Sequence, residues 1–185
     1  MVLDAENLGA ISTEKSDIEI IATDSVSLAN DDSPFGMRGG NTFITILSGM
    51  QTVTQPLDAG GEDINFVSND VAISEDIRSI GASLNIRPVN NAGKIFIGDN
   101  TSGMDLTDIL HLDTSEISKL QNGFKEIVIG STEGQHEIII GDQNTDTGTI
   151  EMLDPFVIQN SQPGGETYIY DDIIGTDDAS LTIKG

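Results

Sequence analysis

Three oxygen-bearing side chains alternate after an apolar run in "IIIGDQNTDTG", namely Asp142, Asn144 and Asp146. Oxygen ligands at every second position are how the first half of a D-x-[DN]-x-[DN]-G calcium loop wraps its cation. The second half departs from that pattern, because Thr147 replaces the sharp-turn glycine and Leu153 replaces the bidentate glutamate. Asp, Asn, Thr and Gly also form ordinary strand-ending turns. We therefore interpret the segment as a structural corner and keep Asp142, Asn144 and Asp146 as a candidate calcium site.

Other corners are rich in carboxylates but have no fixed ligand spacing. They contain Asp99, Asn100, Asp171, Asp172, Asp177 and Asp178. We expect diffuse cation binding at these corners and no tight site.

Catalytic residues are not indicated. His111 and His136 are the two histidines, and both stand beside apolar residues, which favours structural roles over general-base roles. The chain has no nucleophile elbow, phosphate loop or HExxH motif. Arg78 and Arg87 are expected to neutralise neighbouring acids. We predict that the protein is not an enzyme.

The charge and composition exclude several classes of partner. The 185 residues include 31 acidic and 8 basic side chains, for a formal net charge of −23. Such a chain repels nucleic-acid phosphates and anionic lipid headgroups. It has no cysteine, and no apolar run approaches the roughly 20 residues of a membrane helix. The first residues lack a secretory signal pattern, so we expect either an intracellular protein or a segment of a longer exported one.

Short alternating segments dominate the chain and predict β-strands. Hydrophobic residues make up 37% of the chain and are mainly Ile, Val and Leu. Two stretches, 16–28 and 62–73, match each other, since each has an Asp, an alternating apolar pair, a second Asp seven positions later and a second apolar pair. Further segments of this kind bounded by Gly, Asn, Asp or Pro follow to the end, and "IG" endings recur after Ile97, Ile129 and Ile140.

Many short strands are compatible with a sandwich, a barrel or a parallel β-helix. No Asn-Gly or Asp-Gly pair joins two alternating strands as a tight hairpin would require. Corners such as "ATDS" and "VSND" instead have the polar character of bends between the successive sheets of one coil. The pattern therefore favours a β-helix.

One segment, "DTSEISKLQNGF", breaks the strand pattern. Asp113 and Glu116 have the spacing of a capping box, and Gly123 is placed to end a helix. We predict a short helical excursion over residues 113–122. It is expected to pack the apolar side chains Leu110, Ile117, Leu120 and Phe124 over an edge or flank of the coil.

The motifs of residues 60–185 come in a distinctive order. The first three are an "L-x-x-RP" strand at 84–88, an "I-x-IG" strand at 95–98 and a helix whose segment ends in "GF" at 124. They are followed by a second "I-x-IG" strand at 127–130, a "DP-[FV]-x-[IL]" strand at 154–158 and a closing "G-x-[DN]-[DA]-[AS]-x-[IL]" segment at 175–181. In this order they resemble a repeat of large filamentous-haemagglutinin-like exoproteins, especially cyanobacterial ones. Residues 1–60 match that repeat only in style.

The resemblance implies a right-handed parallel β-helix in an extracellular or cell-surface bacterial protein used for attachment or as a scaffold. We expect one β-solenoid domain over residues 1–185, with the haemagglutinin-like repeat in 60–185 and further coils in 1–60. Its function would be that of a stiff structural or adhesive rod. The expected partners are further copies joined end to end, glycans or other surface proteins.

Two alternatives stay open. One is a self-assembling extracellular fibre subunit stabilised by calcium, in which the turn-rich segment 30–43 or the terminal strands contact the next copy. The other is a carbohydrate-active β-helical enzyme, which would need a groove of converging carboxylates.

Overall fold

The computed structural model describes residues 7–8, 11–12, 18–22, 26–28, 37–38, 42–46, 50–54, 56–99, 101, 105–143 and 148–185. Among residues 1–49 only the side chain of Ile20 is described.

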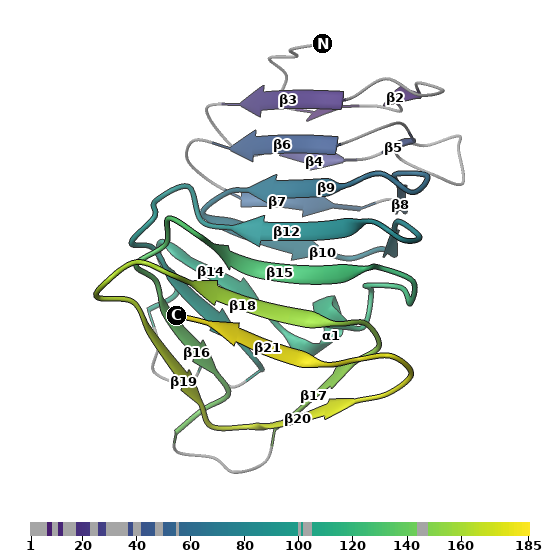
Figure 1. Ribbon diagram of the computed structural model, residues 1–185. Coiled ribbons are helices and arrows are strands. Elements are labelled where there is room, and N and C mark those ends of the chain that lie inside the picture. Colours follow the sequence, from purple (N-terminus) through teal and green to yellow (C-terminus); the bar gives the residue numbers. More distant parts are fainter. Residues whose placement is uncertain are drawn as a thin grey trace.

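The strands form parallel sheets, as the ladder pairings show throughout (Figure 1). Sheet 1 contains β3 (Ile18–Ala22), β6 (Thr42–Ile46), β9 (Ile64–Val67), β12 (Ser83–Arg87), β15 (Glu126–Ser131), β18 (Phe156–Asn160) and β21 (Leu181–Lys184). Sheet 2 contains β1 (Asn7–Leu8), β4 (Val26–Leu28), β7 (Met50–Val53) and β10 (Asp70–Ile73). Sheet 3 contains β2 (Ile11–Ser12), β5 (Met37–Arg38), β8 (Leu57–Asp58) and β11 (Ile77–Arg78).

Two further sheets continue this arrangement toward the C-terminus. Sheet 4 has the order β14 (Ile109–Leu112), β13 (Lys94–Ile97), β16 (Glu137–Ile140) and β19 (Glu166–Ile169). Sheet 5 pairs β17 (Thr149–Met152) with β20 (Asp172–Gly175). The expectation of an all-β protein with parallel strands is confirmed.

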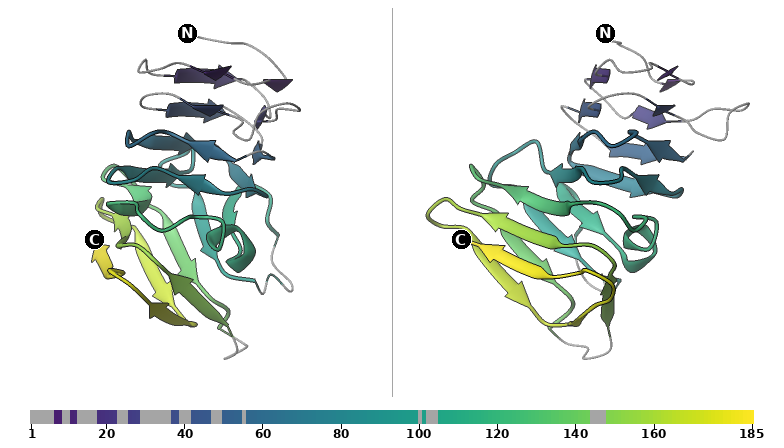
Figure 2. Two further views of the ribbon diagram at one scale, coloured as in Figure 1. Left: turned by 90° about the vertical axis from the view of Figure 1, so that its right-hand side faces the viewer. Right: turned by 45° about the vertical axis from the view of Figure 1, so that its right-hand side comes forward.

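Apart from β13 and β14, which both belong to sheet 4, consecutive strands belong to different sheets. The chain therefore passes through three sheets in turn and then returns to the first. From β9 it runs through β10 and β11 to β12, where Leu84 pairs with Ile64, 20 positions earlier. We call one such passage a coil. Figure 2 shows the coils stacked on one another, with the N-terminal coils at one end and β21 near the other.

Columns of apolar side chains run through the stack, because parallel strands in register place like positions side by side. One column in sheet 1 contains the side chains of Ile20, Phe66, Ile86, Ile129, Ile158 and Ile183, and the backbone of Ile44 in β6 continues the register between Ile20 and Phe66. Ile20, Phe66, Ile86, Ile129 and Ile158 are fully buried. Alternation within each strand thus builds one interior, whose core runs from Ile20 to Ile158.

The two matched stretches of the sequence occupy equivalent places two coils apart. The register carries Ile18 through Thr42 to Ile64 in sheet 1. In sheet 2 it carries Val26 through Gln51 to Val71. The two stretches therefore match because they occupy equivalent positions in stacked coils. Of the "IG" endings, Ile97 and Ile140 pair in sheet 4, whereas Ile129 lies in sheet 1.

The predicted helix is present but shorter than expected. Helix α1 (Thr114–Ile117) has the predicted capping box, in which Asp113 accepts from the Glu116 N–H and Glu116 accepts from the Asp113 N–H. The helix ends early because Leu120 forms a parallel bridge with Ile77 of β11, which draws the chain back into a sheet-like path. All four apolar side chains assigned to this excursion, Leu110, Ile117, Leu120 and Phe124, are buried in the common core.

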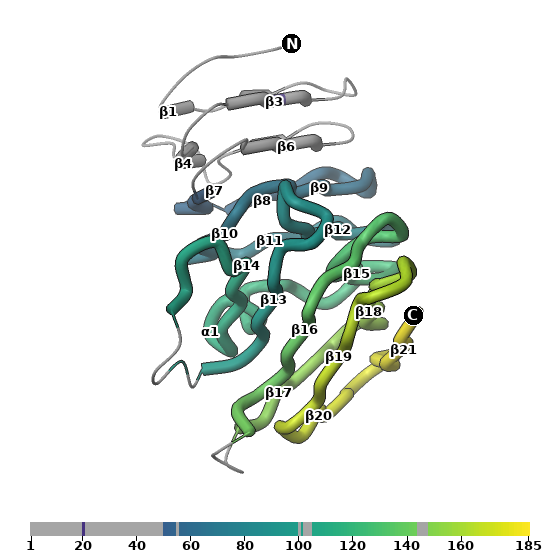
Figure 3. Tube along the Cα trace, turned by 90° about the vertical axis from the view of Figure 1, so that its left-hand side faces the viewer, coloured from purple at the N-terminus to yellow at the C-terminus, as the bar shows by residue number. Residues whose placement is uncertain are grey.

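The coil between β12 and β15 is unusually long, and Leu84 pairs with Ile127, 43 positions later. It contains two strands of sheet 4, since β14 lies between β10 and β13. An added strand widens that side of the stack by about 4.8 Å relative to sheet 1. The strands after this coil are tilted against those before it (Figures 1 and 3).

Helix α1 lies below β11 and beside β14, on the path from β14 of sheet 4 to β15 of sheet 1 (Figure 3). Within the described ranges, no helix has the length and apolar character needed to cross a membrane.

Candidate functional site

The predicted calcium corner follows strand β16. Asp142 is buried, with 8% of its surface exposed, whereas Asn144 and Asp146 lie outside the described residues. Among the residues that the structure describes, no group of three or more His, Asp or Glu side chains is arranged to hold a metal ion. The set Asp142, Asn144 and Asp146 therefore stays a prediction.

A carboxylate from the next coil lies against this corner. A Cβ atom placed on Gly141 or Gly148 would overlap the Asp171 carboxylate, so both glycines leave room for it. Gly141 also has a φ of +82°, which a side chain would strain. Asp171 Oδ1 is buried and has no hydrogen-bond partner among the described residues. Asp171 therefore lies against Gly141, the residue that precedes Asp142, one coil earlier in the chain.

Both histidines make structural hydrogen bonds, as the sequence predicted. His111 Nε2 lies 2.8 Å from the carbonyl oxygen of Gly98, and its ring packs against Phe96 with centroids 5.3 Å apart. His136 is fully buried, with Nδ1 2.8 Å from the carbonyl oxygen of Gly93. Burial lowers the pKa of His136, so its ring is neutral at physiological pH.

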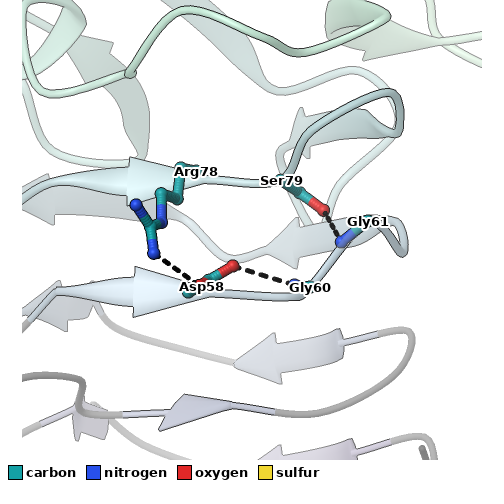
Figure 4. Close-up of polar contacts among 5 residues, drawn as sticks. All are labelled: Asp58, Gly60, Gly61, Arg78 and Ser79. Carbon is teal, nitrogen blue, oxygen red and sulfur yellow. Dashed lines mark hydrogen bonds and ion pairs between the residues drawn. The ribbon is translucent and has the colours of Figure 1, made fainter.

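Arg78 neutralises an acid of the preceding coil, as expected. Its guanidinium lies 2.8 Å from Asp58 Oδ2 (Figure 4). Asp58 Oδ1 accepts from the Gly60 N–H, and Ser79 Oγ accepts from the Gly61 N–H (Figure 4). Polar side chains at this corner therefore satisfy backbone groups and join two coils.

Two carboxylates join β10 of sheet 2 to β14 of sheet 4 and to the N-terminus of α1. Asp70 Oδ1 accepts from the N–H groups of Val71 and His111, at 2.9 and 3.0 Å. Glu116 accepts from the N–H groups of Ile73 and Asp113, both at 2.9 Å. Burial raises the pKa of both carboxyl groups, although the hydrogen bonds oppose the rise. We call Asp70 and Glu116 the carboxylate seam.

A cavity of about 340 Å³ lies between α1 and β17. Its rim is formed by the exposed residues Ser118, Thr149, Glu151 and Leu153. Its floor is buried and apolar and consists of Ile117, Leu120, Ile127, Met152 and Phe156. This combination of an apolar floor and a few polar groups is typical of small-molecule sites.

One edge of β17 faces this cavity and has no partner strand among the strands that the structure describes. On the other edge, the carbonyl oxygens of Gly148 and Met152 accept from Asp172 and Thr176 in the next coil. Alternate residues of a parallel strand direct their amide groups to opposite sides. The backbone N–H and C=O of Glu151 therefore point toward α1, and the described structure shows no backbone hydrogen bond between α1 and β17.

Asp154 also lines the cavity, although only 1% of it is exposed to solvent. Its Oδ1 accepts from the Gly123 N–H at 2.9 Å, whereas Oδ2 is buried without a partner among the described residues. Burial raises the pKa of Asp154; the backbone N–H groups of Gly123 and Phe124 oppose the rise, and the carboxylates of Asp178 and Asp177 add to it. In the sequence Asp154 stands in the "DP" strand motif, and no local pattern there predicts this buried environment.

Apolar side chains are exposed on the last strands of sheets 1, 4 and 5. Leu181 and Ile183 on β21 are 38% and 49% exposed, and Ile169 on β19 and Ile174 on β20 are 41% and 46% exposed. These strands are the terminal members of their sheets, so each has an edge with no partner strand in the described structure. Ile183 continues the column that is fully buried at Ile158.

No family model, no curated protein and no solved structure matches the chain.

Proposed function

We propose that the chain is a right-handed parallel β-helix that acts as a structural or adhesive rod of an extracellular bacterial surface protein. The proposal of a right hand rests on the strong preference of parallel β-crossovers for that hand and on the resemblance to haemagglutinin-like repeats. The extracellular location rests on that resemblance and on the acidic, cysteine-free composition.

The observation that carries a mechanical role is the continuous interior. Side-chain columns in register pass through successive coils, and each inner strand is hydrogen-bonded on both sides. Each coil is therefore stabilised by its neighbours, and the stack resists bending because ladders run along its length. The two histidines are engaged in structural contacts, which supports a non-catalytic role.

A second function is favoured by the exposed terminal strands. A further parallel coil would cover the exposed Ile and Leu side chains of β19, β20 and β21. We propose that a second copy of this chain supplies this coil, which gives end-to-end association. Burying the exposed half of each of four such side chains contributes about 1 kcal/mol apiece. Because association costs at least about 4 kcal/mol, the contact should be weak and dependent on concentration.

Calcium is proposed to strengthen this association. The formal charge of −23 opposes close approach of two copies, and divalent cations at corners such as that of Asp142 and Asp171 would reduce the repulsion.

Sedimentation velocity with negative-stain microscopy, in calcium and in chelator, tests both functions. Concentration-dependent rods that lengthen in calcium are expected. Ile183→Lys should abolish them, whereas Thr182→Lys, one position away on the same strand, should reduce them less because Thr182 is not in the interior column. A monomer at every concentration would remove the fibre function, and release of reducing sugar from polysaccharides would overturn the non-catalytic assignment.

A further inference from the structure

The cavity between α1 and β17 is too large to be a packing defect. Its volume of about 340 Å³ corresponds to roughly eleven water molecules at about 30 Å³ each. It arises because α1 and the turn after it replace the strand that would otherwise pair with β17. The space is therefore a consequence of the topology and exists without any induced opening.

The floor of the cavity favours an apolar group. Ile117, Leu120 and Met152 are 6% exposed or less and meet there from the helix, the bridge after it and β17. A small hydrocarbon or aromatic group placed against them would lose its water contact, which is the main favourable term for such ligands.

The polar groups of the cavity favour a cation. Among the described residues that line it, the ionisable ones are Glu151 and Asp154, both acidic, and none is Lys, Arg or His. The free carbonyl of Glu151 on the β17 edge is an additional acceptor for N–H groups. Within the described part of the chain, the buried Oδ2 of Asp154 has no hydrogen-bond partner, which a buried carboxylate requires.

From these observations we propose that the cavity binds a small organic cation, namely a protonated amine carried on an apolar group. The apolar group lies on the buried floor, and the ammonium group donates to the acceptors at Glu151 and Asp154. An anion is excluded by the two carboxylates, and a neutral ligand leaves Asp154 Oδ2 without a charged partner. This inference does not depend on the rod function.

The negative charges of Asp177 and Asp178 disfavour ionisation of Asp154 when the cavity is empty. A bound ammonium group would oppose the neighbouring negative charges and favour the ionised carboxylate. Binding should therefore release a proton where Asp154 is protonated beforehand, and it should weaken as the pH falls.

The test uses the full chain and 2-phenylethylammonium, with 2-phenylethanol as its neutral counterpart, in about 150 mM salt to suppress diffuse surface binding. Titration calorimetry should show saturable binding of the amine and at least tenfold weaker binding of the alcohol. In an NMR titration the largest amide shifts should fall on Glu151 and Leu153 at the rim.

Variants separate this site from the acidic surface. Asp154→Asn should weaken amine binding at least tenfold, Glu151→Gln should weaken it severalfold, and Ser118→Leu should block the rim. Glu133→Gln, an exposed carboxylate outside the lining, should leave binding unchanged. If Asp154→Asn fails to fold by circular dichroism, the other two variants decide. Equal binding of amine and alcohol, shifts spread over the surface, or no saturable binding would overturn the proposal.

Discussion

The interior column of sheet 1 allows one substitution to be compared at two levels of burial. Ile129 and Ile183 occupy the same column, with exposures of 0% and 49%. Replacing Ile by Ala removes three carbon groups, worth roughly 2.4 kcal/mol when buried at about 0.8 kcal/mol each. At Ile129 a cavity term adds about 1 kcal/mol, whereas at Ile183 only about half of the transfer term applies. We expect Ile129→Ala to cost about 3.5 kcal/mol and Ile183→Ala about 1 kcal/mol.

Urea unfolding at low protein concentration measures both losses. Far-UV circular dichroism reports on all the sheets, whereas tyrosine fluorescence reports on the last coil, because the two tyrosines, Tyr168 and Tyr170, both belong to it and are stacked with centroids 6.2 Å apart. Coincident transitions by the two probes permit a two-state comparison of midpoints.

Thr182→Ala provides a matched control, since Thr182 lies next to Ile183 on β21 but outside the interior column. It should change the free energy of unfolding by less than about 0.5 kcal/mol. Equal losses for Ile129→Ala and Ile183→Ala would refute the reasoning, because burial along the column would then not determine stability.

Three further predictions concern the seam, the helix and a corner. Because burial raises the folded pKa of Asp70 and Glu116, the folded state binds their protons more tightly than the unfolded state. Their contribution to the free energy of unfolding should therefore increase as the pH falls from neutrality toward about 4. Glu116→Gln should flatten that part of a plot of Tm against pH. An unchanged plot would contradict this prediction. Asp113→Ala removes the helix cap and should cost about 1 kcal/mol, or roughly 2–4 °C in Tm by calorimetry. Gly141→Ala should lower Tm more than Gly164→Ala, since both have positive φ but only Gly141 faces the carboxylate of the next coil; equal losses would show that backbone strain alone matters.

Much of the local structure could be predicted from residue patterns. Alternation of apolar residues located the strands at 64–67, 83–87, 127–130 and 156–160 to within one or two residues. The match between the two stretches indicated a repeated two-strand unit, and the Asp113 and Glu116 pair predicted the capping box. These features depend on side chains close in sequence, so the pattern contains the information.

The two-residue strands of sheet 3 and the second strand of the long coil, β14, were not predicted. A strand of two residues, such as β8 or β11, has no alternation to detect, and its conformation comes from pairing with the coils on either side. The helix ended early for the same kind of reason, because Leu120 bridges to a residue 43 positions earlier in the chain.

The candidate sites likewise combine residues that local sequence patterns identify with residues that only the stacking of coils brings together. Asp142 was identified by its spacing from other oxygen-bearing residues, whereas Asp171, 29 positions away, came beside its corner only through stacking. The α1 cavity and the free edge of β17 could not be predicted, because they depend on which strand is missing between two coils.

The sequence by itself determined the strand-rich composition, the strong negative charge, the alternation that separates interior from exterior, and the helix cap, because each follows from the chemistry of neighbouring residues. Only the tertiary structure decided which coils are adjacent, where the extra strand tilts the stack, which carboxylates are buried without a partner, and where a cavity remains. These depend on contacts between residues 20 to 43 positions apart, and the register of parallel strands sets those contacts.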